Sequence, residues 1–520
     1  MRRNTKHLVF SVCVAFVLCA FASVASARTI YVPDDYEKIQ WAVDNATAGD
    51  TIIVRDGIYY ESITVSKQLT IKSEKGPDNC IVNGTGSDVF TLEADGIRIE
   101  GFTITGGENG IYILSNNNTI INNNIRSNNE DGIELWSNSN IISNNNISSN
   151  FDGIELYDSD NNSISTNIIR SNKWDGIFLW HSNNNIISNN NISSNNDDGI
   201  FLYFSDNNSI SENIIRSNKW EGICLSVSNN NSISNNIIGS NNDDGICLGY
   251  SNNNSISNNK IRSNYFGIDL SYSNNNSISE NNISSNDNGI VIWFSNNNII
   301  YMNNFINNTC NAFSNGSNIW NSTETITYTY KGKTFTNYLG NYWEDYTGSD
   351  ADGDGIGDTP YSIDSDRDNY PLIERFENYF VLKKAKIFDT GRPENPYPSI
   401  SGEFVGTIKT NKKIIATKLY TYACEGTGGH TEYAIICNKT WCAEAKWEGY
   451  KEDWMNISFN RTVVLMPYET YNITIVTGSY PQIHHTSSLK TENGWINCTE
   501  FIDANGKKYE NWIPAIKLWS

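Results

Sequence analysis

Between residues 109 and 294 the chain repeats one pattern of hydrophobic and polar positions nine times. Each copy has a run of small polar residues, a Gly-Ile pair, one variable residue and then a second Leu or Ile. The glycines of the pattern are Gly110, Gly132, Gly153, Gly176, Gly199, Gly222, Gly245, Gly267 and Gly289. Successive glycines lie 21 to 23 residues apart. A period of this length indicates stacked repeats, in which each unit buries its hydrophobic face against its neighbours.

Two columns of Ile and two of Asn follow the same period: Ile120 to Ile278, Ile125 to Ile283, Asn123 to Asn281 and Asn128 to Asn286. The hydrophobic runs are short and β-branched, which predicts strands and not helices. Ser and Asn between the runs predict about three turns per repeat. The pattern therefore predicts a triangular coil of parallel strands, in which stacked Asn amides hydrogen-bond along the axis. A leucine-rich-repeat horseshoe is the alternative, but its Leu-rich consensus is missing.

These repeats resemble the right-handed parallel β-helix repeats of the NosD-like family, which is also classed with carbohydrate-binding and sugar-hydrolysis domains. The resemblance extends from about Thr29 to Glu374 and is most specific in a closing motif at residues 340–346, 350–361 and 368–372. It implies an all-β fold but no single activity, because this fold carries lyases, hydrolases, epimerases, adhesins and inert spacers. NosD-like proteins are linked with copper delivery, although these repeats contain no copper-type ligand cluster.

The first 27 residues have the features of a secretory signal peptide, with three basic residues, an apolar run over 8–24 and small residues at 25–27. No other segment is long and apolar enough to span a membrane, so we expect an extracellular or cell-surface protein. Without the three basic residues of the leader, the 37 Lys+Arg become 34 against 58 Asp+Glu, a net charge of −24. This charge argues against nucleic acid and allows cations, and it leaves extracellular polysaccharide or cell-envelope components as the expected partners.

Composition divides the chain into five segments: the leader at 1–27, an N-terminal cap with the first turns of the coil at 28–105, the repeats at 106–305, a closing segment at 306–376 and a second domain at 377–520. In the cap, a short helix with Ile39, Ala42 and Val43 turned inward is expected to cover the open end of the coil. In the second domain the Asn/Ser repetition stops, and short alternating strands predict a β-sandwich.

Alternation along the strand Gly-Ile-x-Leu-x turns both variable positions outward. Six aromatic residues on four successive repeats occupy these positions: Trp136, Tyr157, Phe178, Trp180, Phe201 and Tyr203. Exposed rings at regular spacing suit stacking against sugar rings, so these residues are the predicted carbohydrate-contact strip. The alternative is ordinary surface packing, because β-strands favour aromatic residues.

An acidic residue precedes the glycine in six successive repeats: Asp131, Asp152, Asp175, Asp198, Glu221 and Asp244. This column could bind sugar hydroxyls or cations, or its side chains could only cap backbone N–H groups in turns. Glu134 and Glu155 share one outward column on adjacent turns, roughly 5 Å apart by the strand spacing. That distance is near the carboxyl separation of retaining glycosidases, which makes the two glutamates the candidate catalytic residues. Neighbouring repeats also produce this distance without any catalysis.

Cys224 and Cys247 occupy the same outward column on neighbouring turns. The spacing lies within the range of a disulfide, and a disulfide or two inert thiols are expected in preference to a metal site.

The closing segment contains a loop with the ligand spacing of an EF-hand. Positions 1, 3, 5, 7 and 9 are Asp350, Asp352, Asp354, Ile356 (through its carbonyl) and Asp358. Position 12 is Tyr361, so the bidentate ligand is missing unless Asp364 or Asp366 replaces it. The spacing predicts a structural Ca²⁺, and the alternative is an acidic, turn-rich loop that needs no metal.

Three histidines of the second domain lie in two loops. If the loops converge, Zn²⁺ or Cu²⁺ could bind to His430, Glu432, His484 and His485, with Cys424 as a further ligand. No CxxC or HExxH spacing supports such a site. Alternatively, the histidines cap loops and two disulfides form among Cys424, Cys437, Cys442 and Cys498.

These observations favour an exported protein that binds extracellular carbohydrate or surface partners without catalysis. One alternative is a carbohydrate-active enzyme, a polysaccharide lyase, hydrolase or epimerase, that uses Glu134, Glu155 or the acidic column. The other is a structural rod of the cell envelope or a copper-related accessory protein of the NosD-like kind.

Overall fold

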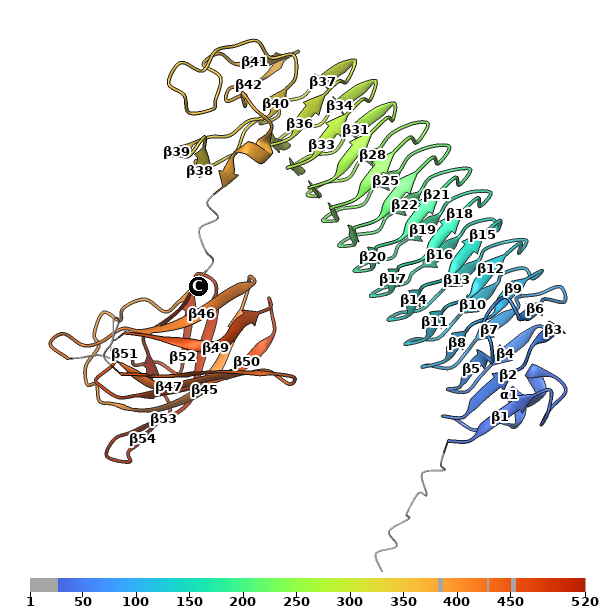
Figure 1. The fold of residues 1–520 in the computed structure, drawn as a ribbon, viewed down its shortest axis with the longest axis horizontal. Helices are drawn as coiled ribbons and strands as arrows, with labels where there is room; N and C mark the ends of the chain where they lie inside the picture. Colours follow the sequence, from blue (N-terminus) through green and yellow to red (C-terminus); the bar gives the residue numbers. More distant parts are fainter. Residues whose placement is uncertain (1–26, 382–386, 428–429, 450–454, 520) are drawn as a thin grey trace, which may run out of the picture. The chain divides into compact units, whose positions relative to one another are not determined.

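The computed structural model describes residues 27–381, 387–427, 430–449 and 455–519 (Figure 1). The predicted leader therefore lies outside the described residues except for its last position. The chain divides into two compact units between Phe380 and Val381, four residues after the boundary expected at 377.

The first unit is a parallel β-helix built from three long sheets. One sheet has 13 strands, from β1 (Thr29–Val32) to β35 (Ile299–Tyr301), and another has 13 strands, from β3 (Gly57–Tyr60) to β40 (Tyr342–Trp343). The third sheet, which we call the site sheet, has 12 strands: β4 (Ile63–Val65), β7 (Phe90–Leu92), β10 (Ile111–Ile113), β13 (Ile133–Leu135), β16 (Ile154–Tyr157), β19 (Ile177–Trp180), β22 (Ile200–Tyr203), β25 (Ile223–Ser226), β28 (Ile246–Gly249), β31 (Phe266–Ser271), β34 (Asn288–Trp293) and β37 (Cys310–Ser314). The predicted triangular coil is confirmed.

The repeated Ile, Leu and Asn columns fill the interior of the β-helix. Ile187 and Ile192, which represent the two Ile columns, are fully buried. Asn190 lies between them, and its Oδ1 accepts hydrogen bonds from the backbone N–H and the side-chain amide of Asn167 at 2.9 and 3.0 Å. Its own amide donates to the Ile164 carbonyl at 3.0 Å. The predicted Asn ladder is therefore confirmed, and it satisfies backbone groups that would otherwise be buried without partners.

The glycine before each strand of the site sheet is required by close packing between turns. A Cβ atom on Gly199 would lie 2.5 Å from the Gly222 carbonyl oxygen and 2.6 Å from Ile215 Cγ2. The corners of each turn use non-glycine residues in the left-handed region, such as Asn184, Asn189 and Ser194 with φ of 59°, 57° and 59°. Asn tolerates this backbone conformation better than most residues, which explains part of the Asn-rich composition.

The helix α1 (Ile39–Asn45) closes the N-terminal end as predicted, with Ile39, Ala42 and Val43 buried. The Glu61 carboxylate accepts the backbone N–H groups of Ile39 and Gln40 at 2.9 and 3.0 Å, which satisfies two donors at the start of the helix.

The other end of the β-helix is closed by residues after β37. They form the hairpin β38 (Ile326–Tyr330) with β39 (Lys333–Asn337) and the hairpin β41 (Tyr361–Ile363) with β42 (Asp366–Asp368). Asp368 is fully buried and accepts hydrogen bonds from the Asn341 N–H at 2.7 Å and the Trp343 indole at 2.9 Å. The closing motif thus ties the last strand of one long sheet to the hairpin that covers the core.

The second unit is an antiparallel β domain, in agreement with the predicted fold class. Its main strands pair in the order β44 (Phe388–Asp389), β56 (Ile516–Trp519), β46 (Ile414–Thr421), β49 (Asn456–Leu465), β48 (Cys442–Lys446), β47 (Thr431–Cys437), β50 (Thr470–Thr477), β45 (Gly402–Thr410), β53 (Gly494–Asp503) and β52 (Ser488–Thr491). The β48–β49 pairing joins what would be two layers of a sandwich into one barrel-like sheet around a core that includes Phe404, Ile475 and Leu518.

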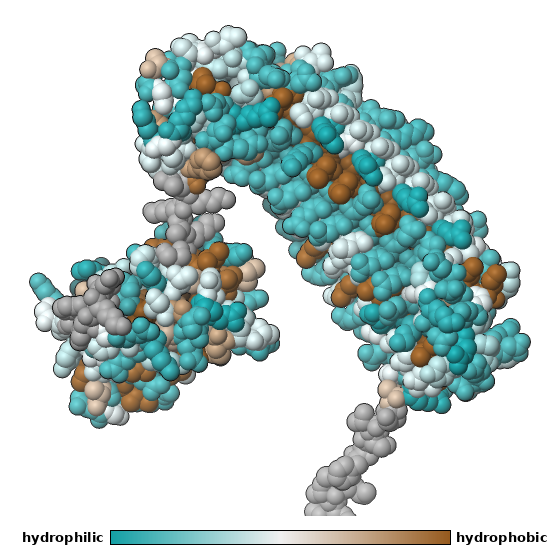
Figure 2. Space-filling view, in the orientation of Figure 1, coloured by the Kyte–Doolittle hydropathy of each residue, from teal (hydrophilic) through white to brown (hydrophobic). Residues whose placement is uncertain are grey.

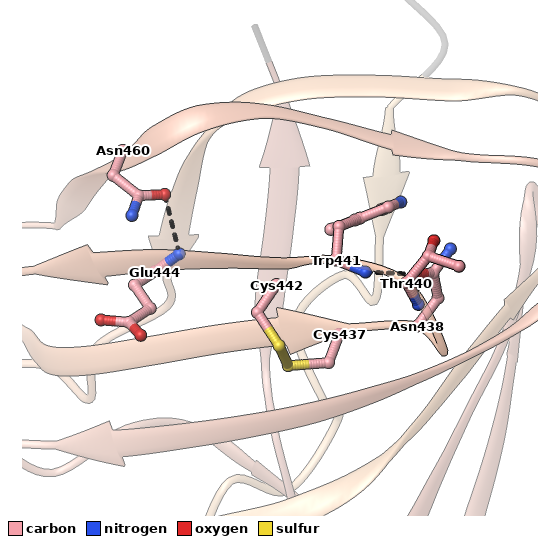
Figure 3. Close-up of a disulfide and its surroundings, with 7 residues drawn as sticks. All are labelled: Cys437, Asn438, Thr440, Trp441, Cys442, Glu444 and Asn460. Atoms are coloured by element: carbon pink, nitrogen blue, oxygen red, sulfur yellow. Dashed lines mark hydrogen bonds between the residues drawn. A yellow bond between two sulfur atoms is a disulfide. The ribbon is translucent and has the colours of Figure 1, made fainter.

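One disulfide, Cys437–Cys442, links the paired strands β47 and β48. Figure 3 shows it beside the Asn438 side chain, which accepts the backbone N–H groups of Thr440 and Trp441 at 2.9 Å. Cys424 and Cys498 are free in this structure, so only one of the two expected disulfides is present.

Candidate carbohydrate-binding hollow

The predicted contact strip lies on the outer face of the site sheet. Figure 2 shows separate hydrophobic patches along the β-helix, set in a largely hydrophilic surface. Trp136 is 43% exposed, whereas Tyr157, Trp180 and Tyr203 are half-buried. The rings of Trp136 and Tyr157 stack with centroids 4.6 Å apart and planes 7° apart. Because these two ring faces cover each other, the stacked pair contributes much of its flat surface to mutual packing and less to a flat platform for sugars.

A hollow opens beside this strip, between the site sheet and the turns that lead into it. Its volume is about 220 Å³. It is lined by Phe151, Asp152, Glu155, Trp174, Asp175, Phe178, Asp197, Asp198 and Phe201, and we call it the aromatic–carboxyl hollow. Sequence reasoning had placed Phe178 and Phe201 in the strip but missed Phe151, Trp174 and Asp197. The sequence contains a pattern that could have identified two of them, because Phe151 and Trp174 directly precede members of the acidic column.

Two stacked aromatic pairs flank the carboxyl groups of the hollow. On the turn side, Phe151 and Trp174 stack with centroids 5.2 Å apart. On the strand side, Phe178 and Phe201 stack with centroids 5.3 Å apart. Trp174 is 51% exposed, so a large part of its indole remains available for contact.

The acidic column forms a ladder of hydrogen bonds. The Oδ1 atom of Asp131 accepts the backbone N–H of Asp152 at 2.9 Å, and Asp152 accepts the N–H of Asp175 at 2.5 Å. Asp175 and Asp198 do the same for the next residue of the column at 2.9 Å. The capping role considered for these residues is therefore present. It uses one oxygen of each carboxyl and leaves the second oxygen for other partners.

Burial and mutual repulsion raise the pKa values of the carboxyls in this region. Burial, followed by the neighbouring Asp175 and Asp131, raises the pKa of Asp152 to about 9. Burial and the nearby Asp197 raise the pKa of Asp175 to about 8. These carboxyls therefore keep a proton near neutral pH and can donate as well as accept hydrogen bonds.

The two candidate catalytic glutamates are in register on β13 and β16. Both oxygens of Glu134 are engaged, because Oε1 accepts the Trp136 indole N–H at 2.7 Å and Oε2 accepts the Asn109 amide at 2.6 Å. Burial and a hydrogen bond shared with Asp131 raise the pKa of Glu155 to about 10. The structure thus places Glu155 in the hollow with Asp131 as its close partner, while Glu134 is held by side chains outside it.

The calcium-like loop brings together three of its four predicted carboxylate ligands. One carboxylate oxygen each of Asp350, Asp352 and Asp354 lies within 4.8 Å of the others. Asp358 accepts hydrogen bonds from Ala351 N–H at 2.9 Å and Ser349 Oγ at 3.1 Å, and it is not part of this group.

The two carboxylates considered as replacements at position 12 have other partners. Asp364 accepts the Ser314 N–H at 3.2 Å, and Asp366 accepts the Ser314 hydroxyl at 2.8 Å and the Trp320 indole at 3.2 Å.

The histidines of the second unit do not meet in this structure. His430 packs on the Trp447 ring and lies 3.9 Å from the Glu432 carboxylate. His484 contacts the Gly391 carbonyl at 3.1 Å, and His485 packs against Trp512. Among the residues that the structure describes, the groups of side chains close enough to share a metal ion all lie in the β-helix.

Two family models match successive parts of the β-helix. Residues 71–213 match the right-handed β-helix region, and residues 193–348 match NosD, a periplasmic copper-binding protein. The first unit is a parallel β-helix that is similar to NosD over residues 193–348. The resemblance seen in the repeats is therefore confirmed for this part of the chain. No helix in the described part of the chain has the length and apolar character needed to cross a membrane.

The chain is also similar to one curated protein and to solved structures. It is 35% identical over 132 residues to a cell surface glycoprotein of Methanothermus fervidus, a match that covers 25% of this chain and only 21% of that relative. The A-module of the mannuronan C-5 epimerase AlgE6 from Azotobacter vinelandii aligns with a TM-score of 0.50 at 17% identity, over 54% of this chain and 92% of that one. The AlgE4 A-module from the same organism aligns with a TM-score of 0.47 at 16% identity, over 56% of this chain and 99% of that one. The AlgE6 likeness shows the fold of the β-helix and not its activity.

Proposed function

We propose that this protein is exported to the cell surface and binds extracellular carbohydrate there without catalysis, through the aromatic–carboxyl hollow. The observation that carries the proposal is the combination of aromatic pairs and carboxyls around one hollow of about 220 Å³. Export and surface location are supported by the similarity to a cell surface glycoprotein and to a periplasmic family.

The chemistry of the hollow suits a sugar ring. Aromatic side chains such as Trp174 and Phe178 pack against the C–H groups of a pyranose, and carboxyl groups such as Asp175 accept or donate hydrogen bonds to its hydroxyls. Sites for small polar ligands combine apolar walls with a few placed polar groups in this way. The stacked rings of Trp136 and Tyr157, which belong to the predicted contact strip, would extend the contact with the sugar chain along the same sheet.

The net charge of the chain selects among polysaccharides. Burial keeps most carboxyls of the hollow protonated, but the whole chain carries a formal charge of −21. A polyuronate would be repelled by this field, whereas a neutral glycan or one that contains amino sugars would not. We therefore expect the ligand to be a neutral or amino-sugar polymer, in spite of the uronate-modifying enzymes that share the fold.

The test is retention of the purified protein on a panel of neutral, amino-sugar and uronate polysaccharides. Trp174→Ala is the site variant and Trp220→Ala is its matched control, because both tryptophans are 51% exposed and precede an acidic residue and a glycine. Only Trp174 lines the hollow. We expect wild-type protein and Trp220→Ala to be retained by a neutral or amino-sugar polymer and Trp174→Ala to bind at least tenfold more weakly.

The Trp136→Ala/Trp180→Ala double variant separates the strip from the hollow. Loss of binding in this variant alone would move the site to the strip. Equal retention of wild-type, Trp174→Ala and double-variant protein, or no retention on any polymer, would refute the proposal.

A glycoside hydrolase is the second candidate, and one observation favours it. Glu155 shares a hydrogen bond with Asp131, and burial keeps its pKa high, which is the state required of a general acid. Release of reducing sugars from a retained polymer, abolished in Glu155→Gln, would establish this activity. Binding without release would leave the hollow as a binding site.

We also propose that the loop at Asp350, Asp352 and Asp354 binds a structural Ca²⁺. Its support is the convergence of three carboxylates within 4.8 Å, which oxygen-seeking cations favour. Calcium titration followed by calorimetry should show one site that is lost in Asp352→Asn. Unchanged binding in that variant, or no binding at all, would leave the loop as a metal-free turn.

A further inference from the structure

The acidic column meets the two cysteines of the site sheet one and two turns beyond the hollow. Cys224 and Cys247 are paired in register on β25 and β28, and Cys247 is paired with Asp269 on β31. One ligand atom each of Asp244, Cys247 and Asp269 lies within 4.8 Å of the others. Cys247 also belongs to a second group of this kind, with Glu221 and Cys224.

Two buried oxygens of this cluster have no hydrogen-bond partner. Asp244 is 6% exposed and Asp269 is 9% exposed, and the Oδ1 atom of each is buried and unpartnered. In earlier members of the acidic column, the Oδ1 atom accepts a hydrogen bond from a backbone N–H of the following turn. These members are Asp131, Asp152, Asp175 and Asp198. At Asp244 the next residue of the column is Phe266, whose backbone N–H acts on the Asp244 carboxyl but leaves its Oδ1 atom without a partner. The acidic column therefore ends at Asp244, beside Cys247.

The charges around the cluster do not supply a counter-ion from the protein. The ionisable groups that act on Asp244 are Asp269, Asp243 and Glu221, and all three are acidic. None of Asp244, Asp269 and Glu221 takes part in an ion pair within the described residues. A buried carboxylate without a partner is costly, and a bound cation removes that cost.

We propose that Asp244, Cys247 and Asp269 bind a divalent d-block cation of the zinc type. Thiolate sulfur and carboxylate oxygen are both zinc ligands, with bonds of about 2.0–2.3 Å in a tetrahedral set. Two ligands of such an ion lie about 3–4 Å from each other, which the side chains of this cluster reach by small rotations. Calcium and magnesium are disfavoured because they do not use thiolate.

The test uses the full-length protein, purified without metal and with a mild reductant that is then removed. Zn²⁺ is titrated by calorimetry, and Co²⁺ is added as a spectroscopic probe, because a thiolate ligand produces an intense charge-transfer absorption. We expect one Zn²⁺ per chain and a thiolate–cobalt band. Cys247→Ser should abolish the band and, like Asp269→Asn, weaken Zn²⁺ binding at least tenfold. Asp269→Asn keeps the shape of the side chain, so its effect is expected without loss of the fold.

Matched controls lie outside the cluster. Cys310→Ser removes an exposed cysteine, and Asp287→Asn removes an exposed aspartate, so both should bind Zn²⁺ like the wild type. Equal Zn²⁺ affinity in wild-type protein and Asp269→Asn would overturn the proposal. So would a disulfide between Cys224 and Cys247 in protein purified without reductant, detected by mass spectrometry of linked peptides. These readouts do not depend on carbohydrate binding, so the two proposals can fail separately.

Discussion

The two units of this chain build their cores by different rules. In the β-helix, the residues of the interior ladders contact the same residue type one turn away, as Asn167 contacts Asn190 and Asn190 contacts Asn213. In the C-terminal unit, strands far apart in the sequence are partners, as Gly402–Thr410 pairs with Gly494–Asp503. Because the same contacts repeat along the axis, a β-helix tolerates a change in the number of turns. It does not tolerate a substitution that disturbs the contact between neighbouring turns.

The largest expected effect is a methyl group added at the repeat glycine. In Gly199→Ala the new Cβ would lie 2.5 Å from the Gly222 carbonyl oxygen, so neighbouring turns must separate. We expect the free energy of unfolding of the β-helix to fall by about 3 kcal/mol, at the upper end for overpacked sites. Denaturant unfolding followed by hydrogen exchange of β-helix peptides measures the change.

Gly249→Ala is the matched control for this prediction, because a Cβ there would meet only the Leu225 carbonyl oxygen, at 4.0 Å. Similar losses in both variants would show that turn-to-turn contact at the repeat glycine is not the reason for its presence.

Removal of one rung of the Asn ladder should cost slightly less. Asn190→Ala removes the acceptor of the buried Asn167 backbone N–H and side-chain amide, and it removes one donor to the Ile164 carbonyl. Buried groups that lose their partners cost about 1–3 kcal/mol each, so we expect a loss of about 2.5 kcal/mol in the same assay. The exposed Asn242 provides the control, and Asn242→Ala should change stability by less than about 0.5 kcal/mol.

The disulfide of the C-terminal unit is expected to contribute to its stability, as the Asn ladder contributes to the stability of the β-helix. Cys437 and Cys442 are five residues apart, and the chain-entropy model gives about 2 kcal/mol for so short a loop. The Cys437→Ser/Cys442→Ser variant should lose about this amount in the C-terminal unit alone. Hydrogen exchange that also accelerates in β-helix peptides would contradict the independence of the two units.

The same difference explains how much could be read from the sequence. Columns such as Ile187 and Asn190 were placed correctly, because a fixed period puts equivalent residues in contact on neighbouring turns. The helix over Ile39 and Val43 was also found, because its burial follows from local spacing. The cluster of Asp244 with Cys247 and Asp269 escaped prediction because Asp244 belongs to a different column from the other two, and only the three-dimensional turn brings the two columns together. The distance between His430 and His484 was likewise unreadable, because it depends on long-range strand order.

The response to pH separates the two units by sign. The pKa of Asp152 is raised to about 9 by burial and its acidic neighbours, whereas an unfolded aspartate has a pKa near 3.9. Between these values the folded state holds a proton that the unfolded state has released, so the stability of the β-helix falls as pH rises. In the C-terminal unit, hydrogen bonds from the backbone N–H groups of Lys507 and Asn505 lower the pKa of Asp503, which gives the opposite sign below pH 4.

Hydrogen exchange of peptides from each unit at pH 3, pH 5 and pH 8, corrected for intrinsic rates, measures this contrast. We expect the β-helix to lose stability between pH 5 and pH 8, and Asp152→Asn to lose less. The amide oxygen of Asn can still accept the Asp175 N–H, as the Asn109 side chain does for Asp131. The substitution therefore removes the titrating proton and keeps the ladder. An unchanged pH slope in Asp152→Asn would mean that this carboxyl is ionised in the folded protein and that a cation, not a proton, balances the acidic column.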